Sequence, residues 1–177
     1  MSRFDYDDDG EDFPGQGDLW QANLERALKG KRGRKALADL RAALLALPQP
    51  RLIEGALCTV NTEKRAAGRN HLAASDLRYR TEEQGEGVCA VGALLWHGKV
   101  KAGMDPAEAF DSLPTLPDSD YDLDDTARLA ARHAGLVYCL AYDLAYRNDE
   151  TYQNATPEER YTAFLGWIDH ELAGASS

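Results

Sequence analysis

Long apolar runs are absent from this sequence, and so are closely spaced pairs of cysteine or histidine. No stretch approaches the eighteen or more apolar residues that a membrane-spanning helix needs, and the first residues contain no apolar signal core. The three cysteines, Cys58, Cys89 and Cys139, are far apart and odd in number, which is typical of reduced thiols and not of a disulfide framework. The sequence therefore predicts a cytoplasmic protein with free thiols and no membrane segment.

Motifs for metal binding and nucleotide hydrolysis are also missing. The cysteines and histidines form no C-x₂-C or H-x₃-H pair, the spacing that structural zinc sites use. The nucleotide-binding pattern G-x-x-x-x-G-K-[S/T] does not occur. Asp5-x-Asp7-x-Asp9-Gly10 copies the opening of an EF-hand calcium loop, but Gln16 stands where the loop needs a bidentate glutamate. We therefore expect neither a bound metal nor a cofactor.

One arrangement has catalytic potential. Cys89 follows a glycine-containing loop at the start of a predicted helix, a position that favours a thiolate, and His133 could act as its base. Apolar residues flank Cys89 on both sides, however, and free cysteines are among the most buried residues in proteins. The pattern favours a structural thiol and a binding protein, and leaves a cysteine hydrolase that uses Cys89 and His133 as the less favoured alternative.

Apolar residues make up 44% of the 177 residues, which is enough for one core in a chain of this length. They recur at three- and four-residue steps, the period of a helix with one buried face. Capping residues, glycines and prolines bound the predicted helices. These are residues 18–28, a segment after Gly33 that ends at Pro48, 88–96, a short one from Asp105-Pro106, a long one through Leu129 and Leu144 to about Arg147, and 156–174.

The remaining segments are less regular. Residues 51–60 fit either a helix or a strand, and residues 62–77 fit at best a polar helix. Residues 1–17 contain six acids, three glycines and one proline without a helical period, which is typical of a solvated tail. We predict an all-α fold, a compact multi-helix single domain over residues 18–175, with a disordered acidic tail over residues 1–17.

Charge is distributed unevenly along the chain. The net charge is −10, yet residues 29–80 hold 12 of the 20 Lys and Arg residues and only four acids. That segment carries +8, the 28 residues before it carry −6 and the residues after it carry −12. A basic block between two acidic ones can serve an acidic partner, or the acidic flanks of the chain can neutralise it.

The densest basic run is Lys29-Gly-Lys31-Arg32-Gly-Arg34-Lys35, which we place in the turn between the first two predicted helices. Anions are attracted to such a position, because the positive end of the second helix lies beside it. The alternative is a solvated turn that only keeps the protein soluble. The predicted partner-binding residues are Lys29, Lys31, Arg32, Arg34, Lys35, Lys64, Arg65 and Arg69.

The second half of the chain contains Gly-Val-Cys-Ala-Val-Gly-Ala-Leu at 87–94, Leu-Ala-Tyr-Arg-Asn-Asp-Glu at 144–150 and Thr-Pro-Glu-Glu-Arg-Tyr at 156–161. Over about residues 85–173 this pattern resembles small uncharacterised proteins of bacteriophages and their bacterial hosts. The resemblance implies a phage or prophage origin and no particular chemistry.

Together these observations predict a non-enzymatic phage or prophage accessory protein that binds its partner stoichiometrically. The expected partner is a host or phage protein that handles nucleic acid, in the manner of an anti-defence inhibitor. Direct binding of nucleic acid through residues 29–80 is the alternative. The charge of −10 favours the protein partner, because a bare nucleic acid would be repelled at long range.

Overall fold

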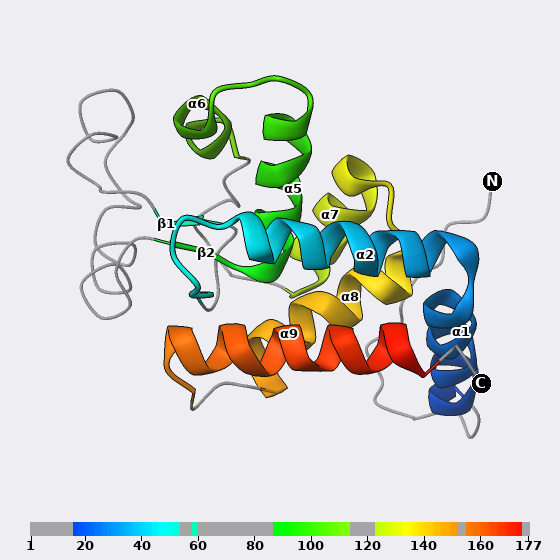
Figure 1. Ribbon diagram of the computed structural model, residues 1–177. Helices are drawn as coiled ribbons and strands as arrows, with labels where there is room; N and C mark the ends of the chain where they lie inside the picture. The colour runs from blue at the N-terminus through cyan, green and yellow to red at the C-terminus, as the bar shows by residue number, and fades with distance from the viewer. Residues whose placement is uncertain (1–15, 54–57, 60–86, 114–122, 152–154, 175–177) are drawn as a thin grey trace, which may run out of the picture.

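The computed structural model describes residues 16–53, 58–59, 87–113, 123–151 and 155–174 (Figure 1). Its elements, in chain order, are α1 (Gln16–Lys29), α2 (Lys31–Ala46), β1 (Cys58–Thr59), β2 (Gly87–Val88), α5 (Ala90–Lys101), α6 (Pro106–Asp111), α7 (Leu123–Ala134), α8 (Tyr138–Tyr146), the π-helical turn η1 (Arg147–Thr151) and α9 (Pro157–Ala173). The prediction of an all-α fold is confirmed. Within the described ranges, the strands form one short antiparallel ladder in which Cys58 pairs with Val88.

Helices α2 and α9 lie side by side, with α8 crossing behind them and α1 standing at one end (Figure 1). The core between them is built by the helical period of the sequence. Leu37, Leu40 and Leu44 face inward from α2, and Phe164 and Ile168 face them from α9. Each of these side chains is almost fully buried, so the apolar stripe predicted from the spacing is the stripe that packs.

Helix α5 begins in the centre of this core, as the apolar segment 88–96 predicts. All seven residues from Ala90 to Trp96 are buried, and the small residues Ala90, Gly92 and Ala93 allow neighbouring elements to approach closely. Beyond Trp96 the helix emerges, and it ends in Lys99 and Lys101. One end of α5 therefore lies in the core, and the other end lies at the surface.

Two of the helix caps read from the sequence are present, at the starts of α6 and α9, whereas Asp18 lies within the first turn of α1. Thr156 and Glu159 form a capping box at the start of α9, with Pro157 in the first turn. The Asp105 carboxylate accepts hydrogen bonds from the amides of Ala107 and Glu108 at the start of α6. These side chains bond amides that the helices themselves leave without partners.

The junction of α1 and α2 differs from the prediction. Helix α2 begins at Lys31 and contains Gly33, whereas the sequence analysis placed Gly33 before the helix. A Cβ atom at Gly33 would lie 1.9 Å from the carbonyl oxygen of Ala27. Gly33 is therefore a contact between the two helix backbones, and the basic run lies mostly on α2 instead of in a turn.

The long helix predicted to run to Arg147 is two helices. Gly135 has a φ of +66° and ends α7, and α8 begins at Tyr138 after an extended residue, Val137. The left-handed conformation suits glycine, because it has no Cβ atom to clash. The break allows α8 to fold back against α7, and His133 is exposed near the end of α7.

The tyrosines of α8 form a second packing side of that helix. Tyr142 and Tyr146 stack with ring centroids 6.5 Å apart, and Trp20 of α1 meets Tyr142 edge-on at 5.4 Å. Edge-on aromatic pairs of this kind are favourable. They hold α1 against α8.

Several expectations fall outside the described residues or on their borders. The predicted polar helix at 62–77 and most of the tail lie outside them, whereas Gln16 and Gly17 belong to α1. Of the segment 51–60, residues 51–53 have no regular secondary structure and Cys58–Thr59 is strand. Among the helices described here, none is both long and apolar enough to cross a membrane.

Candidate functional site

A buried polar cluster lies at the N-terminal end of α5, centred on Asn148 of η1. The Asn148 Oδ1 atom accepts a hydrogen bond of 3.1 Å from the amide of Ala90. Its Nδ2 donates to the carbonyl oxygen of Ile53 at 2.8 Å and to the Asp149 carboxylate at 2.6 Å. One side chain thus ties η1 to the start of α5 and to the segment 51–53.

The same segment is bonded on its other sides by α9 and β2. The guanidinium of Arg160, 2% exposed, donates to the Leu52 carbonyl oxygen at 3.1 Å. The Leu52 amide donates to the Pro157 carbonyl, and the Ile53 amide to the Val88 carbonyl. A buried segment without regular structure needs such partners for its backbone groups. Asn148 and Arg160 therefore provide hydrogen bonds that a helix or a sheet would otherwise provide.

Cys89 belongs to this cluster and caps α5. It is 4% exposed, and its Sγ atom accepts a hydrogen bond from the Gly92 amide at 3.4 Å. A nucleophilic thiol needs access to a substrate as well as a lowered pKa. The burial of Cys89 supports its role as a helix cap in the core.

The two members of the suggested catalytic pair are separated. Cys89 precedes the first residue of α5, whereas His133 lies beside residues of the C-terminal half of the helix. A helix of twelve residues is about 18 Å long. The structure therefore does not bring a base to Cys89 from α7.

The predicted partner-binding residues have different surroundings. Lys29 is exposed and forms an ion pair of 3.1 Å with Glu25, one turn earlier on α1. Lys31 and Arg32 are exposed in the first turn of α2, and neither has an ion-pair partner among the described residues. Lys64, Arg65 and Arg69 lie outside the described residues. We refer to Lys29, Lys31 and Arg32 as the basic corner.

Arg34 and Lys35 are engaged within the fold. The guanidinium of Arg34 donates to the carbonyl oxygen of Leu172 at 2.8 Å, so it caps the last turn of α9. Lys35 is exposed but forms an ion pair with Asp39 on the next turn of α2. Arg34 is consequently a structural residue.

The first turn of α2 contains no acidic residue. The amides at a helix N-terminus already carry a partial positive charge, and cations placed there add to it. Lys31 and Arg32 consequently reduce the stability of the isolated helix slightly and raise the local positive potential. A helix N-terminus with added cations favours the approach of anions.

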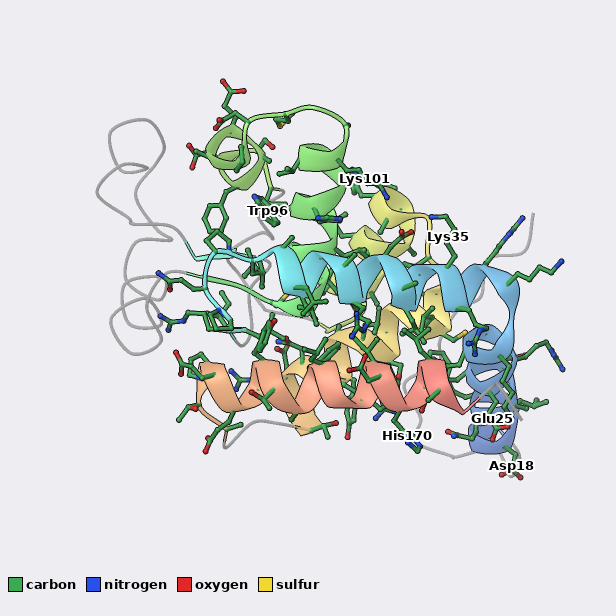
Figure 2. All side chains as sticks on the ribbon, viewed as in Figure 1. Asp18, Glu25, Lys35, Trp96, Lys101 and His170 are labelled. Carbon is green, nitrogen blue, oxygen red and sulfur yellow. The ribbon has the colours of Figure 1, made fainter. Side chains whose placement is uncertain are left out.

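A groove opens between α2, α5 and α7, beside the basic corner. It has a volume of about 470 Å³ and contains residues of all three helices. They are Lys35 and Asp39 of α2, Leu94, Leu95, His97, Gly98, Lys99 and Lys101 of α5, Ala102, and His133 and Ala134 of α7. Figure 2 shows Lys35 on α2 and Lys101 above it, near the end of α5 that points away from α2. We refer to this set as the cationic groove.

Charge in the cationic groove is strongly one-sided. Three lysines face a single acid, Asp39, which already pairs with Lys35. In the described part of the chain, neither Lys99 nor Lys101 pairs with an acid. Lys99 and Lys101 are not among the predicted binding residues, because they lie outside the basic block and follow a buried apolar segment.

The described residues thus define a small helical protein with cationic side chains gathered on α2 and at the end of α5. Within those residues, no three His, Cys, Asp or Glu side chains gather as a metal ion would require. No protein-family model, curated protein or solved structure matches this chain.

Proposed function

We propose that this chain is a non-enzymatic binding protein that docks on an acidic surface of a partner protein through the basic corner. The observation that carries the proposal is the first turn of α2, where Lys31 and Arg32 are exposed beside the positive end of the helix. Exposed cations near other fixed positive charges contribute to association rates and specificity more than to folding. The partner is a host or phage protein that handles nucleic acid, as in phage or prophage inhibitors of host defence.

The overall charge of −10 supports a protein partner over a bare nucleic acid. Nucleic acid would meet the long-range repulsion of the whole chain, whereas an acidic patch on a protein of mixed charge would meet mainly the basic corner. Direct DNA binding is the outcome that would replace this proposal. A shift assay with duplex DNA should show no binding at about 150 mM salt, where phosphate contacts are already weakened.

Charge reversal at two places tests the docking position. Lys31→Glu with Arg32→Glu changes the net charge by the same amount as Lys99→Glu with Lys101→Glu in the cationic groove. The captured partner, purified after affinity capture from host lysate, would be titrated against both double variants. We expect the corner variant to weaken binding about 100-fold and the groove variant to weaken it much less. Charges in direct contact with the partner interact strongly, whereas charges farther away are screened by salt. Equal losses in both variants would contradict docking at the corner.

A further inference from the structure

The cationic groove is a separate feature from the basic corner, and it is large enough to hold a small molecule. Its volume of about 470 Å³ lies within the range of ligand pockets, roughly 300–1,000 Å³. Three helices contribute to it, so its groups are held on rigid elements. The groove is open to solvent on one side, since Lys35, Lys101 and His133 are exposed.

The groove combines charged and apolar walls. Leu94 and Leu95 are nearly buried beneath it, and Ala102 and Ala134 complete the apolar part. The ammonium groups come from Lys35, Lys99 and Lys101. A ligand that fits both parts has a compact anionic group attached to an apolar or aromatic body.

Gly98 lies on the wall of the groove. A glycine inside a helix reduces its stability by about 1 kcal/mol relative to alanine. Gly98 has no left-handed φ, and a Cβ atom there would meet nothing within 4 Å. Neither backbone conformation nor packing therefore requires glycine at this position. The missing side chain leaves open the space that Lys99, Lys101 and His133 surround.

Lys99 and Lys101 have a simpler role as well. Cations in the last turn of a helix interact favourably with its negative end. That role accounts for the charge at the end of α5, but not for the arrival of Lys35 and His133 from two other helices. The additional features distinguish a ligand site from a charged helix end.

We propose that the cationic groove binds a small phosphate-bearing ligand of about mononucleotide size. Lys99 and Lys101 contact the phosphate, Lys35 and its ion-pair partner Asp39 form the wall on the α2 side, and Leu94 and Leu95 contact the attached ring. Phosphate suits this set because lysine ammonium groups are compact point charges with three donors each, and a phosphate oxygen can accept from several of them. The proposal is independent of the docking partner at the basic corner.

The test uses the full chain and calorimetric titration at low salt with AMP, inorganic phosphate and adenosine. We expect AMP to bind more tightly than either fragment, because it alone fills both parts of the groove. Lys99→Glu with Lys101→Glu should weaken AMP binding by about tenfold or more, the effect of losing one charge-assisted contact. The control is the double variant Lys31→Glu with Arg32→Glu, which changes the net charge by the same amount. It should keep most of the affinity for AMP.

Gly98 provides a steric test. Gly98→Phe should abolish AMP binding by filling the groove, whereas Gly98→Ala should fold at least as well and retain binding. Circular dichroism and a urea titration would establish that both variants are folded. Absence of saturable AMP binding, or unchanged binding by a folded Gly98→Phe variant, would overturn the proposal. Equal losses in the corner and groove double variants would also overturn it, because they would indicate an effect of net charge alone.

The source of the phosphate is decided by one more comparison. A dinucleotide with a 5′ phosphate and the same dinucleotide without it would be titrated against the chain. Binding of the phosphorylated dinucleotide with the affinity of AMP would identify a nucleic-acid end as the ligand. Failure of the dinucleotide to bind while AMP binds would identify a free nucleotide, and both results support the site.

Discussion

The two ends of α5 hold polar side chains that are used in opposite ways. At the N-terminal end, Asn148 and Arg160 are buried and bond backbone groups of α5 and of residues 51–53. At the C-terminal end, Lys99 and Lys101 have no acid beside them within the described residues and lie along an open groove. The first set holds the fold together, and the second set is available to a ligand.

Burial explains the difference. An unmade hydrogen bond inside a protein is unfavourable by about 1–3 kcal/mol, so buried polar groups are paired. An exposed ammonium group is hydrated and needs no partner for the chain to fold. Mutations at the two ends of α5 should therefore affect stability at one end and binding at the other.

The largest expected effect is at Asn148. Asn148→Ala removes the partners of the Ala90 amide and the Ile53 carbonyl, and it should lower the free energy of unfolding by about 3 kcal/mol. Asn148→Asp keeps the acceptor for Ala90 but loses the donor for Ile53. Glu150→Ala, an exposed position on the same turn, is the control and should change stability by less than about 0.5 kcal/mol. Urea titrations measure all three, and equal values for Asn148→Ala and Glu150→Ala would refute the role of Asn148.

Alanine substitutions at two glycines should change the stability of the protein in opposite directions. Gly33→Ala should destabilise the protein by about 1–3 kcal/mol, because the new methyl group overlaps the Ala27 carbonyl and forces α1 from α2. Gly98→Ala should stabilise it by about 0.5–1 kcal/mol, because the methyl group enters open space on a helix. Melting temperatures of the two variants should move in opposite directions. A loss of stability in Gly98→Ala would mean that Gly98 serves the packing of α5.

The charge reversals should have small effects on folding, with opposite signs. Glutamates at positions 31 and 32 face the positive end of α2, so this double variant should gain up to about 1 kcal/mol. Glutamates at positions 99 and 101 face the negative end of α5 and should reduce stability by a similar amount, about 1 kcal/mol or less. Urea titrations at low and high salt would measure both, and the difference should shrink as salt screens the charges. A large loss of stability in either variant would show that these cations support the fold.

The smallest expected effect concerns Glu159. Its pKa is lowered from the usual 4.5 by hydrogen bonds from Thr156, first from the backbone amide. Because the folded pKa is the lower one, this carboxylate stabilises the fold above pH 4.5, and the contribution is lost as the pH falls through the lowered value. Glu159→Gln should remove this part of the pH dependence. Urea midpoints of both proteins at pH 7 and pH 3 would test it, and identical shifts would contradict it.

Local features of the sequence were sufficient for most helices. The steps between Leu37, Leu40 and Leu44 correctly predicted which face of α2 is buried, because a helix places every third or fourth residue on one side. Thr156 and Glu159 marked the start of α9 for a similarly local reason. In each case the interacting residues lie within one or two turns of the chain, so their spacing alone determines the contact.

The tertiary structure alone decided the break at Gly135 and the roles of the polar residues. Glycine is compatible with a helix or with the left-handed conformation, and the packing of α8 against α7 selects the second. Asn148 bonds groups that are 58 and 95 residues away, and Arg34 bonds Leu172 across 138 residues. Lys35, Lys99 and His133 come together only when three helices pack. A linear pattern contains no information about such pairs, because their proximity depends on how the whole chain folds.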